Sequence, residues 1–435
     1  MQNTTASRSI ALAVVLAGAT VVGACSSSKS SSSTATTQAA SASSPTTAAA
    51  TTTTAAELGT PKAATGTPLR LGYITDGKTA NIDNSSEVPA AQAAVRFVNG
   101  YLGGIAGHPI TLDVCDDQQT PSGATDCGNQ FATDKVTAVL DNVTGQGVPL
   151  FAALQASGIP LVAYQSADMP VLSAKSGAYV VANPLVYAFA GPAKLAQQAG
   201  VTRAAVIVTD VPSAATPAKA LDPIFYKNAG VAVDIVAIPV GTADLTPQIQ
   251  AELGKNPGQF QVFGDVSLCT AAIKAIKAST FTGSVVVIPQ CITATSAASI
   301  PGGYAGLKLV TSASNDPTDP DNKIYIAAMK AYSPGTDPFV NGVTQGGFAA
   351  VLGFARAMTG ATGDFSPAGI NATITAMGSQ PLPFGGGLAF QCNGKQLSIA
   401  PAVCSTGALA ATLDQSGKPT GSFTPIDASA ILKFG

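Results

Sequence analysis

The sequence contains only one histidine, His108, and no pair of cysteines separated by two residues. Zinc sites favour closely spaced cysteine and histidine ligands, so we expect no metal. A Ser-His-Asp triad needs a histidine base, and the sequence also lacks the Gly-x-Ser-x-Gly turn of many hydrolases. His108 itself lies in a glycine-rich turn, where a structural role is the simpler interpretation. The sequence therefore favours binding without turnover and without a cofactor.

Charge of either sign is scarce, because charged residues make up only 11% of the chain, with 22 basic against 24 acidic side chains. Proteins that bind nucleic acid or anionic membrane surfaces carry an excess of basic residues, so we expect neither partner. After the N-terminal segment, no apolar run reaches the roughly 20 residues that a membrane-spanning helix needs. Hydrophobic residues make up 46% of the chain, which predicts that most surfaces are packed or covered by helices.

The N-terminal segment has the features of a secretory signal. Arg8 precedes an uncharged, apolar run over residues 10–24, which is too short to span a bilayer comfortably. Its last residues and the next one, VGAC at 22–25, resemble the lipobox of bacterial lipoproteins. That resemblance implies a signal peptide over residues 1–24, a diacylated Cys25 and an extracytoplasmic protein anchored by lipid to the cell membrane. Ordinary cleavage after Gly23 or Ala24, with no role for Cys25, is the alternative.

Residues 25–68 follow as a segment of little but serine, threonine and alanine. Such a composition cannot bury enough apolar surface to offset the entropy of ordering, so we expect a disordered tether. About 40 residues of this kind have a mean reach of roughly 35 Å. The tether would hold a folded region away from the membrane.

Six cysteines remain after Cys25, which in an exported chain indicates three disulfides. Six cysteines allow 15 connectivities, and sequence does not choose among them rigorously. We expect neighbours to pair, because each neighbouring pair brackets one supersecondary unit. The expected pairs are Cys115–Cys127, Cys269–Cys291 and Cys392–Cys404.

From Leu69 onward, short β-rich runs alternate with amphipathic helical stretches. This alternation predicts parallel sheets with right-handed crossovers, hence an α/β fold. The runs fall into two sets, which indicates two doubly wound lobes. The first set of strands is LRLGYI, ITLDVC, VTAVLD and IPLVAY. After AYVVAN the second set begins, with the strands RAAVIVTD, VAVDIVAIPV, QVFGD and SVVVIPQ.

The later part of the chain does not repeat this pattern. Residues 319–377 are mainly helical, and residues 385–434 return to short strands and turns. We expect these segments to cross back and complete the two lobes. The expected division is residues 69–186 plus 313–383 for the first lobe and 187–312 plus 384–435 for the second.

Ligands of open α/β sheets bind beyond the carboxyl ends of the strands. Where two such lobes face each other, the strand ends would line a shared cleft. The polar loops that follow the strands therefore supply the candidate ligand-binding residues. These are Asp76, Lys78, Asn142, Thr144, Ser166, Ala167 and Asp168 in the first lobe and Asp210, Asp265 and Gln290 in the second.

Two further motifs suggest catalysis but lack the required context. Residues 72–79, GYITDGKT, match the GxxxxGK[ST] phosphate loop, but Gly72 falls inside the first strand and no helix begins at once. Asp116 and Asp117 are adjacent in extended chain, so their side chains should point to opposite faces and not form an acid/base pair.

The segment VRFVNGYLGGIAGHPITLDVCDDQQTP resembles the leucine/isoleucine/valine-binding family of ABC-transporter solute receptors, in which GGIxG precedes a strand that ends in two aspartates. VTAVLDNVTGQG and GIPLVAYQSADMP are similar to later segments of the family, and the likeness covers nearly all of residues 69–435. It implies a type I periplasmic-binding-protein fold with three hinge crossings and a ligand trapped by lobe closure.

The resemblance also assigns roles to residues. It places residues 142–144 and 166–168 around a ligand carboxylate, and it puts the uncharged Gln290 where the family commonly has a carboxylate for the ligand's amino group. VPS at 211–213 stands where the family has a tyrosine, and Asp168 stands where a hydroxyl residue is usual. These departures argue against an ordinary α-amino acid as the ligand.

We therefore expect a lipid-anchored receptor that captures a small polar ligand, such as an amino acid, an amide or a related compound, and delivers it to an ABC permease. A sensor that presents its closed form to a signalling partner is the first alternative. An extracytoplasmic hydrolase that uses Lys78 is the second.

Overall fold

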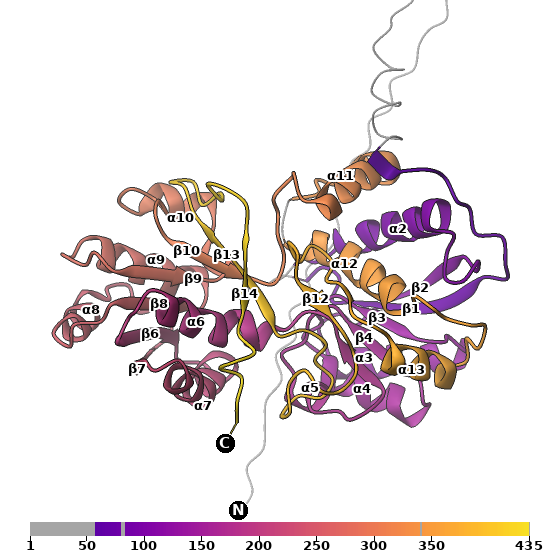
Figure 1. Ribbon diagram of the computed structural model, residues 1–435, viewed down its shortest axis with the longest axis horizontal. Helices are drawn as coiled ribbons and strands as arrows, with labels where there is room; N and C mark the ends of the chain where they lie inside the picture. The colour runs from indigo at the N-terminus through magenta and orange to yellow at the C-terminus, as the bar shows by residue number, and fades with distance from the viewer. Residues whose placement is uncertain (1–56, 80–82, 340–341, 435) are drawn as a thin grey trace, which may run out of the picture. The chain divides into compact units, whose positions relative to one another are not determined.

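The computed structural model describes residues 57–79, 83–339 and 342–434 (Figure 1). These residues belong to one compact unit, Thr47–Gly435. The expected signal peptide, the lipidated Cys25 and most of the expected tether lie outside the described residues.

The first lobe is built on a sheet of five parallel strands in the order β2-β1-β3-β4-β5. Both faces of this sheet are covered by helices, which explains why β1, β3, β4 and β5 are almost entirely buried, whereas β2, at an edge, is only partly buried. The strands are β1 (Leu69–Thr75), β2 (Ile110–Asp116), β3 (Val139–Asp141), β4 (Leu161–Ala163) and β5 (Ala178–Val180).

Helices from distant parts of the sequence cover the two faces of this sheet. On one face, α2 (Glu87–Phe97) and α12 (Gly342–Ala357) pack against Leu71 and Tyr73 of β1. On the other face, α3 (Pro121–Thr133) and α4 (Gly147–Ala156) pack against Ile74. The remaining elements of this lobe are η1 (Val98–Leu102), α5 (Met169–Leu172), α11 (Pro320–Tyr332), α13 (Pro367–Ala376), β11 (Gln380–Pro381) and β12 (Ala389–Phe390).

Local chemistry fixes where these elements begin. The Thr120 hydroxyl accepts a hydrogen bond from the Gly123 amide (3.0 Å), and Pro121 stands at the first position of α3, where a proline is well tolerated. Inside β1, Gly72 lies so close to the Phe131 ring that an added Cβ would come within 2.8 Å of it. The absence of a side chain at Gly72 therefore lets α3 approach the sheet closely.

The second lobe is built on a seven-stranded sheet in the order β14-β13-β10-β9-β8-β6-β7. Its first five strands in sequence are parallel, whereas β13 runs antiparallel to β10 and β14 antiparallel to β13. The strands are β6 (Arg203–Thr209), β7 (Ala232–Ile238), β8 (Gln259–Phe263), β9 (Ser284–Val287), β10 (Lys308–Thr311), β13 (Gly407–Thr412) and β14 (Thr424–Asp427). The helices are η2 (Val186–Ala190), α6 (Gly191–Gln198), α7 (Pro212–Asn228), α8 (Thr246–Leu253), α9 (Val266–Lys277), η3 (Pro289–Cys291) and α10 (Ala294–Ser299).

The chain passes between the two sheets three times: from β5 to η2, from β10 to α11 and from β12 to β13. The first two passages lie close to the expected boundaries at residues 186 and 312. For the third passage, Phe384, Phe390 and Cys404 belong to the core that packs on β1. These contacts favour a return to the second lobe near residue 405 rather than at residue 384.

The described end of the expected tether is not an extended, unpacked segment. Leu58 is buried against the core of the first lobe. The Lys62 and Ala64 amides donate hydrogen bonds to the carbonyls of Gly100 and Asn99, each at 2.8 Å. Residues 58–66 are thus part of the folded lobe, because one buried leucine and backbone pairing outweigh their polar composition, and the expected boundary at residue 68 is too late.

The described residues contain three disulfides: Cys115–Cys127, Cys269–Cys291 and Cys392–Cys404. These are the neighbouring pairs that sequence analysis favours. The first joins β2 to α3, the second joins α9 to η3, and the third closes the segment between β12 and β13. Each disulfide therefore ties together consecutive segments of a single lobe.

Candidate functional site

Three of the expected site residues meet at the carboxyl ends of adjacent strands. Asp76 follows β1, and Asn142 and Thr144 follow β3, which pairs with β1 in register. All three side chains are buried. The parallel order β2-β1-β3 also brings the end of β2, with Asp117, to the same edge.

The Thr144 hydroxyl is the centre of this group. Its Oγ1 lies 2.8 Å from Oδ1 of Asp76 and 2.7 Å from Oδ2 of Asp117, and it accepts a hydrogen bond from the Gln146 amide at 2.9 Å. The Gly145 amide donates to Asp76 at 3.3 Å. Donors of the β3–α4 loop are thus directed at carboxyl groups of the chain itself.

A third carboxyl group lies beside Asp76 and Asp117. Glu87, in the first turn of α2, accepts hydrogen bonds from the Thr75 hydroxyl (2.5 Å) and from the Asn142 side-chain amide (2.9 Å). Burial is the main cause that raises the pKa of Glu87 to about 7; these two hydrogen bonds oppose the rise, and the charges of Asp76 and Asp117 add to it. Glu87 therefore ties α2 to the ends of β1 and β3.

Asp141, the last residue of β3, adds a fourth buried carboxyl group. Its Oδ2 accepts a hydrogen bond from the Thr144 amide at 3.3 Å. Burial, followed by the charge of Glu87, raises the pKa of Asp141 well above its usual value. In the described part of the chain, no ion pair involves Asp76, Glu87, Asp117 or Asp141. We call these four residues the acidic strand-end cluster.

Lys78 does not join this cluster. Its Nζ forms an ion pair with Asp83 at 2.6 Å, and its side chain is 68% exposed. Hydrogen bonding and charge from Asp83 raise the pKa of Lys78. The GKT motif also lacks the local structure of a phosphate loop, because Gly72 lies inside β1 and α2 begins only at Glu87.

The loop after β4 holds the other expected first-lobe residues. Ser166 is buried and its hydroxyl accepts a hydrogen bond from the Asp168 amide at 3.2 Å, whereas Ala167 is exposed. Asp168 is partly exposed beside Gly147, where an added Cβ would come within 2.3 Å of Oδ2 of Asp168. Burial raises the pKa of Asp168, and the Gly147 amide opposes that change.

The expected second-lobe residues follow β6, β8 and β9. Asp210 is exposed, with Lys219 at 3.8 Å. Asp265 caps α9 by accepting hydrogen bonds from the amides of Ser267 (2.8 Å) and Leu268 (3.0 Å), so it has a structural role. Gln290 is exposed and lies within hydrogen-bonding reach of Tyr187. No hydrogen bond or ion pair described here joins these residues to the acidic strand-end cluster.

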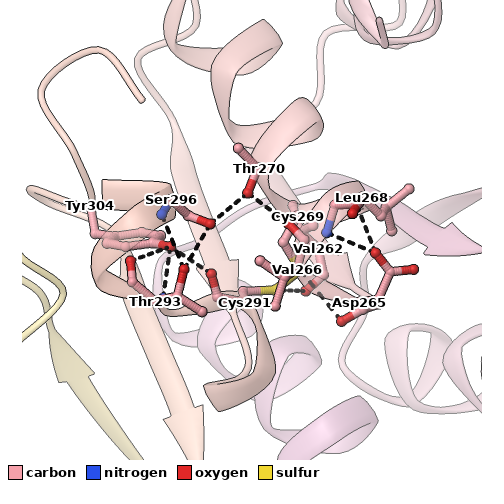
Figure 2. Close-up of a disulfide and its surroundings, with 12 residues drawn as sticks. Val262, Asp265, Val266, Leu268, Cys269, Thr270, Cys291, Thr293, Ser296 and Tyr304 are labelled. Atoms are coloured by element: carbon pink, nitrogen blue, oxygen red, sulfur yellow. Dashed lines mark hydrogen bonds between the residues drawn. A yellow bond between two sulfur atoms is a disulfide. The ribbon is translucent and has the colours of Figure 1, made fainter. Parts of the chain in front are cut away.

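Figure 2 shows how this end of the second lobe is held together. The disulfide Cys269–Cys291 joins the first turn of α9 to η3, next to Asp265. The Tyr304 hydroxyl donates to the Cys291 carbonyl at 2.7 Å and accepts from the Thr293 amide at 3.1 Å. The loop that carries Gln290 is therefore fixed by a covalent bond and by a buried tyrosine.

Sequence reasoning missed the carboxyl groups that complete the first-lobe cluster. The sequence relates Asp117 only to its neighbour Asp116, and these two side chains do not pair. The side chain of Asp117 instead contacts Thr144, 27 residues further along the chain. Asp141 is the last residue of a strand and Asp76 directly follows one. The expectation that ligands bind at the carboxyl ends of strands could therefore have included Asp141. Glu87 had no comparable signal, because its place depends on how α2 packs on the sheet.

Two hollows of the first lobe lie away from these residues. One, of about 230 Å³, is lined by Leu102, Ile105 and Met358, and the other, of about 560 Å³, by Asp321, Arg356 and the 385–387 glycines. None of the expected site residues lines either hollow.

Two parallel α/β sheets with polar strand ends, joined by three passages of the chain, define a bilobal binding protein. The sequence profile of the family described as "Periplasmic binding protein" matches residues 68–403. The chain belongs to that family. The members bind solutes, and the described part of the chain contains no helix long and apolar enough to cross a membrane.

Solved structures share this fold at low sequence identity. A putative branched-chain amino acid ABC transporter protein from Rhodospirillum rubrum is 16% identical, with a TM-score of 0.68 over 82% of this chain and 100% of its own. An ABC transporter substrate-binding protein from Desulfitobacterium hafniense, in complex with Leu, is 14% identical, with a TM-score of 0.62 over 82% and 100%. A solute-binding protein from R. palustris, in complex with 4-hydroxybenzoate, is 15% identical, with a TM-score of 0.61 over 83% and 96%. A search of curated proteins gives no match.

Proposed function

We propose that this chain is the extracytoplasmic solute-binding receptor of an ABC importer. The observation that carries the proposal is the pair of parallel-sheet lobes joined by three passages, in a chain whose family match spans residues 68–403. Three short passages are a hinge about which two lobes can close on a ligand. The closed receptor would then deliver its ligand to a membrane permease.

The ligand is a small molecule with polar groups, held by hydrogen bonds from strand-end loops. Residues that are accessible in these loops are the best candidates for direct contact: Asp168 in the first lobe and Asp210 and Gln290 in the second. Thr144 and Asp76 are buried at the strand ends of the first lobe and would shape the site without contacting the ligand directly. The structural neighbours that hold Leu or 4-hydroxybenzoate support a ligand of this size.

The membrane attachment proposed for this receptor is a lipid on Cys25. The apolar run over residues 10–24 and the VGAC sequence support it. Because an acyl chain is attached through the cysteine sulfur, Cys25→Ser should move the protein from the membrane fraction to the soluble fraction. A variant that stays in the membrane fraction would contradict the lipid anchor but not the binding function.

The binding function is tested on the purified full-length chain. Native mass spectrometry would show any ligand that copurifies, and thermal-shift screening of amino acids, amides and small organic acids would extend the search. A ligand that binds only the folded state raises the melting temperature. Asp168→Ala and Gln290→Ala should each weaken binding roughly tenfold, the effect of losing one good hydrogen bond.

The matched control is Asp126→Ala, which removes an exposed carboxylate in the middle of α3 and not at a strand end. Thr144→Ala is a poorer probe, because the hydroxyl makes buried contacts that hold the loop together. If a ligand is found and both site variants bind it as tightly as the control does, the assignment of the site is wrong.

A further inference from the structure

The hydrogen bonds of Thr144 require one more hydrogen than its own side chain provides. Its Oγ1 is within hydrogen-bonding distance of a carboxyl oxygen of Asp76 (2.8 Å) and of a carboxyl oxygen of Asp117 (2.7 Å). The hydroxyl carries one hydrogen, and an ionised carboxylate carries none. The Gln146 amide already occupies one lone pair of this oxygen as a donor. Both short contacts can be hydrogen bonds only if one of the two carboxyl groups is protonated.

Burial and, to a smaller extent, the charge of Asp76 raise the pKa of Asp117, so the two carboxyl groups are close enough to interact electrostatically. Two carboxylates repel, whereas a carboxylic acid and a carboxylate share a proton. Asp76 and Asp117 are both buried, at 5% and 0% exposure, so solvent does little to screen the repulsion. The geometry is therefore that of an acid–carboxylate pair bridged by a hydroxyl.

The charged groups around this pair do not supply a countercharge. Glu87 of α2 and Asp141 of β3 add two more buried carboxyl groups. Asp116 at the end of β2 approaches Gly77, and Asp168 lies beside Gly147, the first residue of α4. The basic group of this edge, Lys78, is committed to Asp83. In the described residues, every titratable group that faces the pair is thus acidic, which favours keeping a proton there.

We propose that Asp76, Thr144 and Asp117 share one proton that fastens the β3–α4 loop to the ends of β1 and β2, and that loss of this proton as the pH rises releases the loop. Without the proton, the Thr144 hydroxyl can satisfy only one of its two acidic neighbours. The loop that carries Gly145 and Gln146 then loses an attachment. That this loop borders the ligand site rests on the proposed function, whereas the shared proton does not.

The pH range in which the shared proton is lost follows from the pKa of Asp117. Burial is the main cause that raises the pKa of Asp117 to about 6; the Thr144 hydroxyl and the Gln119 amide oppose the rise, and Asp76 adds to it. The unfolded chain has an aspartate pKa of about 3.9, so the folded state binds this proton roughly 100-fold more tightly. A raised pKa contributes stability that is fully present below about pH 4 and is lost as the pH rises through about 6.

The test measures urea unfolding of the full-length chain, without ligand, between about pH 4 and pH 8. This range includes the aspartate pKa of the unfolded chain and the raised pKa of Asp117 in the folded chain. The parent chain should unfold at a lower urea concentration as the pH rises through about 6. In Asp117→Asn an amide N–H supplies the hydrogen permanently, so the variant should lose much of this decline. Glu87, whose pKa is raised to about 7, is present in both chains. The difference between the two chains therefore reports the shared proton together with the smaller change that loss of the Asp117 charge makes at Glu87.

The matched control is Asp116→Asn, which removes the same charge one residue earlier from an exposed side chain whose Oδ1 accepts from the Gln118 amide. It should keep the decline of the parent chain. If Asp117→Asn does not fold, Asp76→Asn takes its place, since either amide can supply the hydrogen. The proposal is overturned if the variant declines as the parent does, or if the parent shows no decline in this range. Because no ligand is present, either result leaves the binding function to be judged by its own test.

Discussion

At the scale of single residues, two adjacent glycines decide how closely the site is assembled. Both lie in α12, where it crosses α2 and the end of β3. A Cβ on Gly346 would come within 2.0 Å of Oδ1 of Asn142, and a Cβ on Gly347 within 2.3 Å of the Glu87 carbonyl oxygen. The backbone of α12 thus touches both Asn142 and Glu87, whose hydrogen bond joins the end of β3 to α2. A side chain at either position would push these elements apart.

We predict that Gly347→Ala destabilises the protein by about 1–3 kcal/mol, the range for overpacking a well-filled core. The carbonyl that it would strike belongs to backbone and cannot rotate away. Gly353→Ala in the same helix is the control, since its Cβ would meet the nearest atom at an ordinary 3.4 Å. The control should be neutral or gain up to about 1 kcal/mol of helix propensity. Equal free energies of unfolding for the two variants would contradict this account.

The residues of the candidate site were only partly predictable from sequence. Asp76 and Thr144 could be found because they follow buried strands that are neighbours in a parallel sheet. The burial of these two side chains could not be predicted, because loops at strand ends are usually exposed to solvent. Asp117 contacts Asp76 only through the hydroxyl of Thr144, and Glu87 is brought to the strand ends by the packing of α2. Neither contact can be predicted from neighbouring residues in the sequence. The accessible Asp168 and Gln290 stay predictions until a ligand is identified.

At the scale of secondary-structure elements, one ion pair joins three parts of the first lobe. Arg356 of α12 forms two hydrogen bonds to Asp321 of α11, at 2.6 and 2.8 Å, with the side chains only 20% and 12% exposed. Asp321 also accepts a hydrogen bond from the Phe384 amide at 2.9 Å, in the segment between β11 and β12. The pair therefore orients α11, α12 and the β11–β12 connection together.

We expect Arg356→Met to cost about 3 kcal/mol, because it leaves the mostly buried Asp321 carboxylate without its countercharge. Arg70→Met is the matched control: Arg70 pairs with Asp113, but these side chains are 51% and 28% exposed, and such surface pairs contribute about 1 kcal/mol or less. Urea unfolding at neutral pH measures both. A loss for Arg356→Met no larger than that of the control would mean that the pair is not important for holding these elements together.

Elements with strong patterns were predictable, and short ones were not. The expected runs LRLGYI, ITLDVC and RAAVIVTD correspond to β1, β2 and β6 because each is rich in apolar residues and lies between polar loops. The two-residue strands β11 and β12 carry no periodicity at all, and they exist because the lobe around them holds them in register. The antiparallel pairing of β13 with β10 likewise depends on tertiary contacts.

At the scale of the whole molecule, the three passages between the sheets govern how the protein can move. Each links an element of one lobe to an element of the other. If binding closes the lobes about these passages, small-angle scattering should show a smaller radius of gyration at saturating ligand than without it. The ligand is the one identified by thermal shift, and a compound that gives no thermal shift is the control. An unchanged radius at saturation would argue against capture by lobe closure.

The division into two α/β lobes was predictable from two successive sets of strands and helices. The last boundary was not. Residues 384–404 resemble the short strands and turns that complete the second lobe, but Phe390 and Cys404 pack in the core of the first. Only the three-dimensional arrangement tells which lobe a short apolar segment completes.

The order of these segments along the chain also has a consequence for biogenesis. The sheet β1–β5 is synthesised first, but α11, α12 and Phe384, which cover one of its faces, follow only after all five parallel strands of the second lobe. A chain that emerges N-terminus first therefore exposes an apolar face of its first sheet until nearly the last residues arrive. Neither lobe is a contiguous stretch of sequence, so neither can be expressed by simple truncation, and a break in any of the three passages leaves two unfinished pieces.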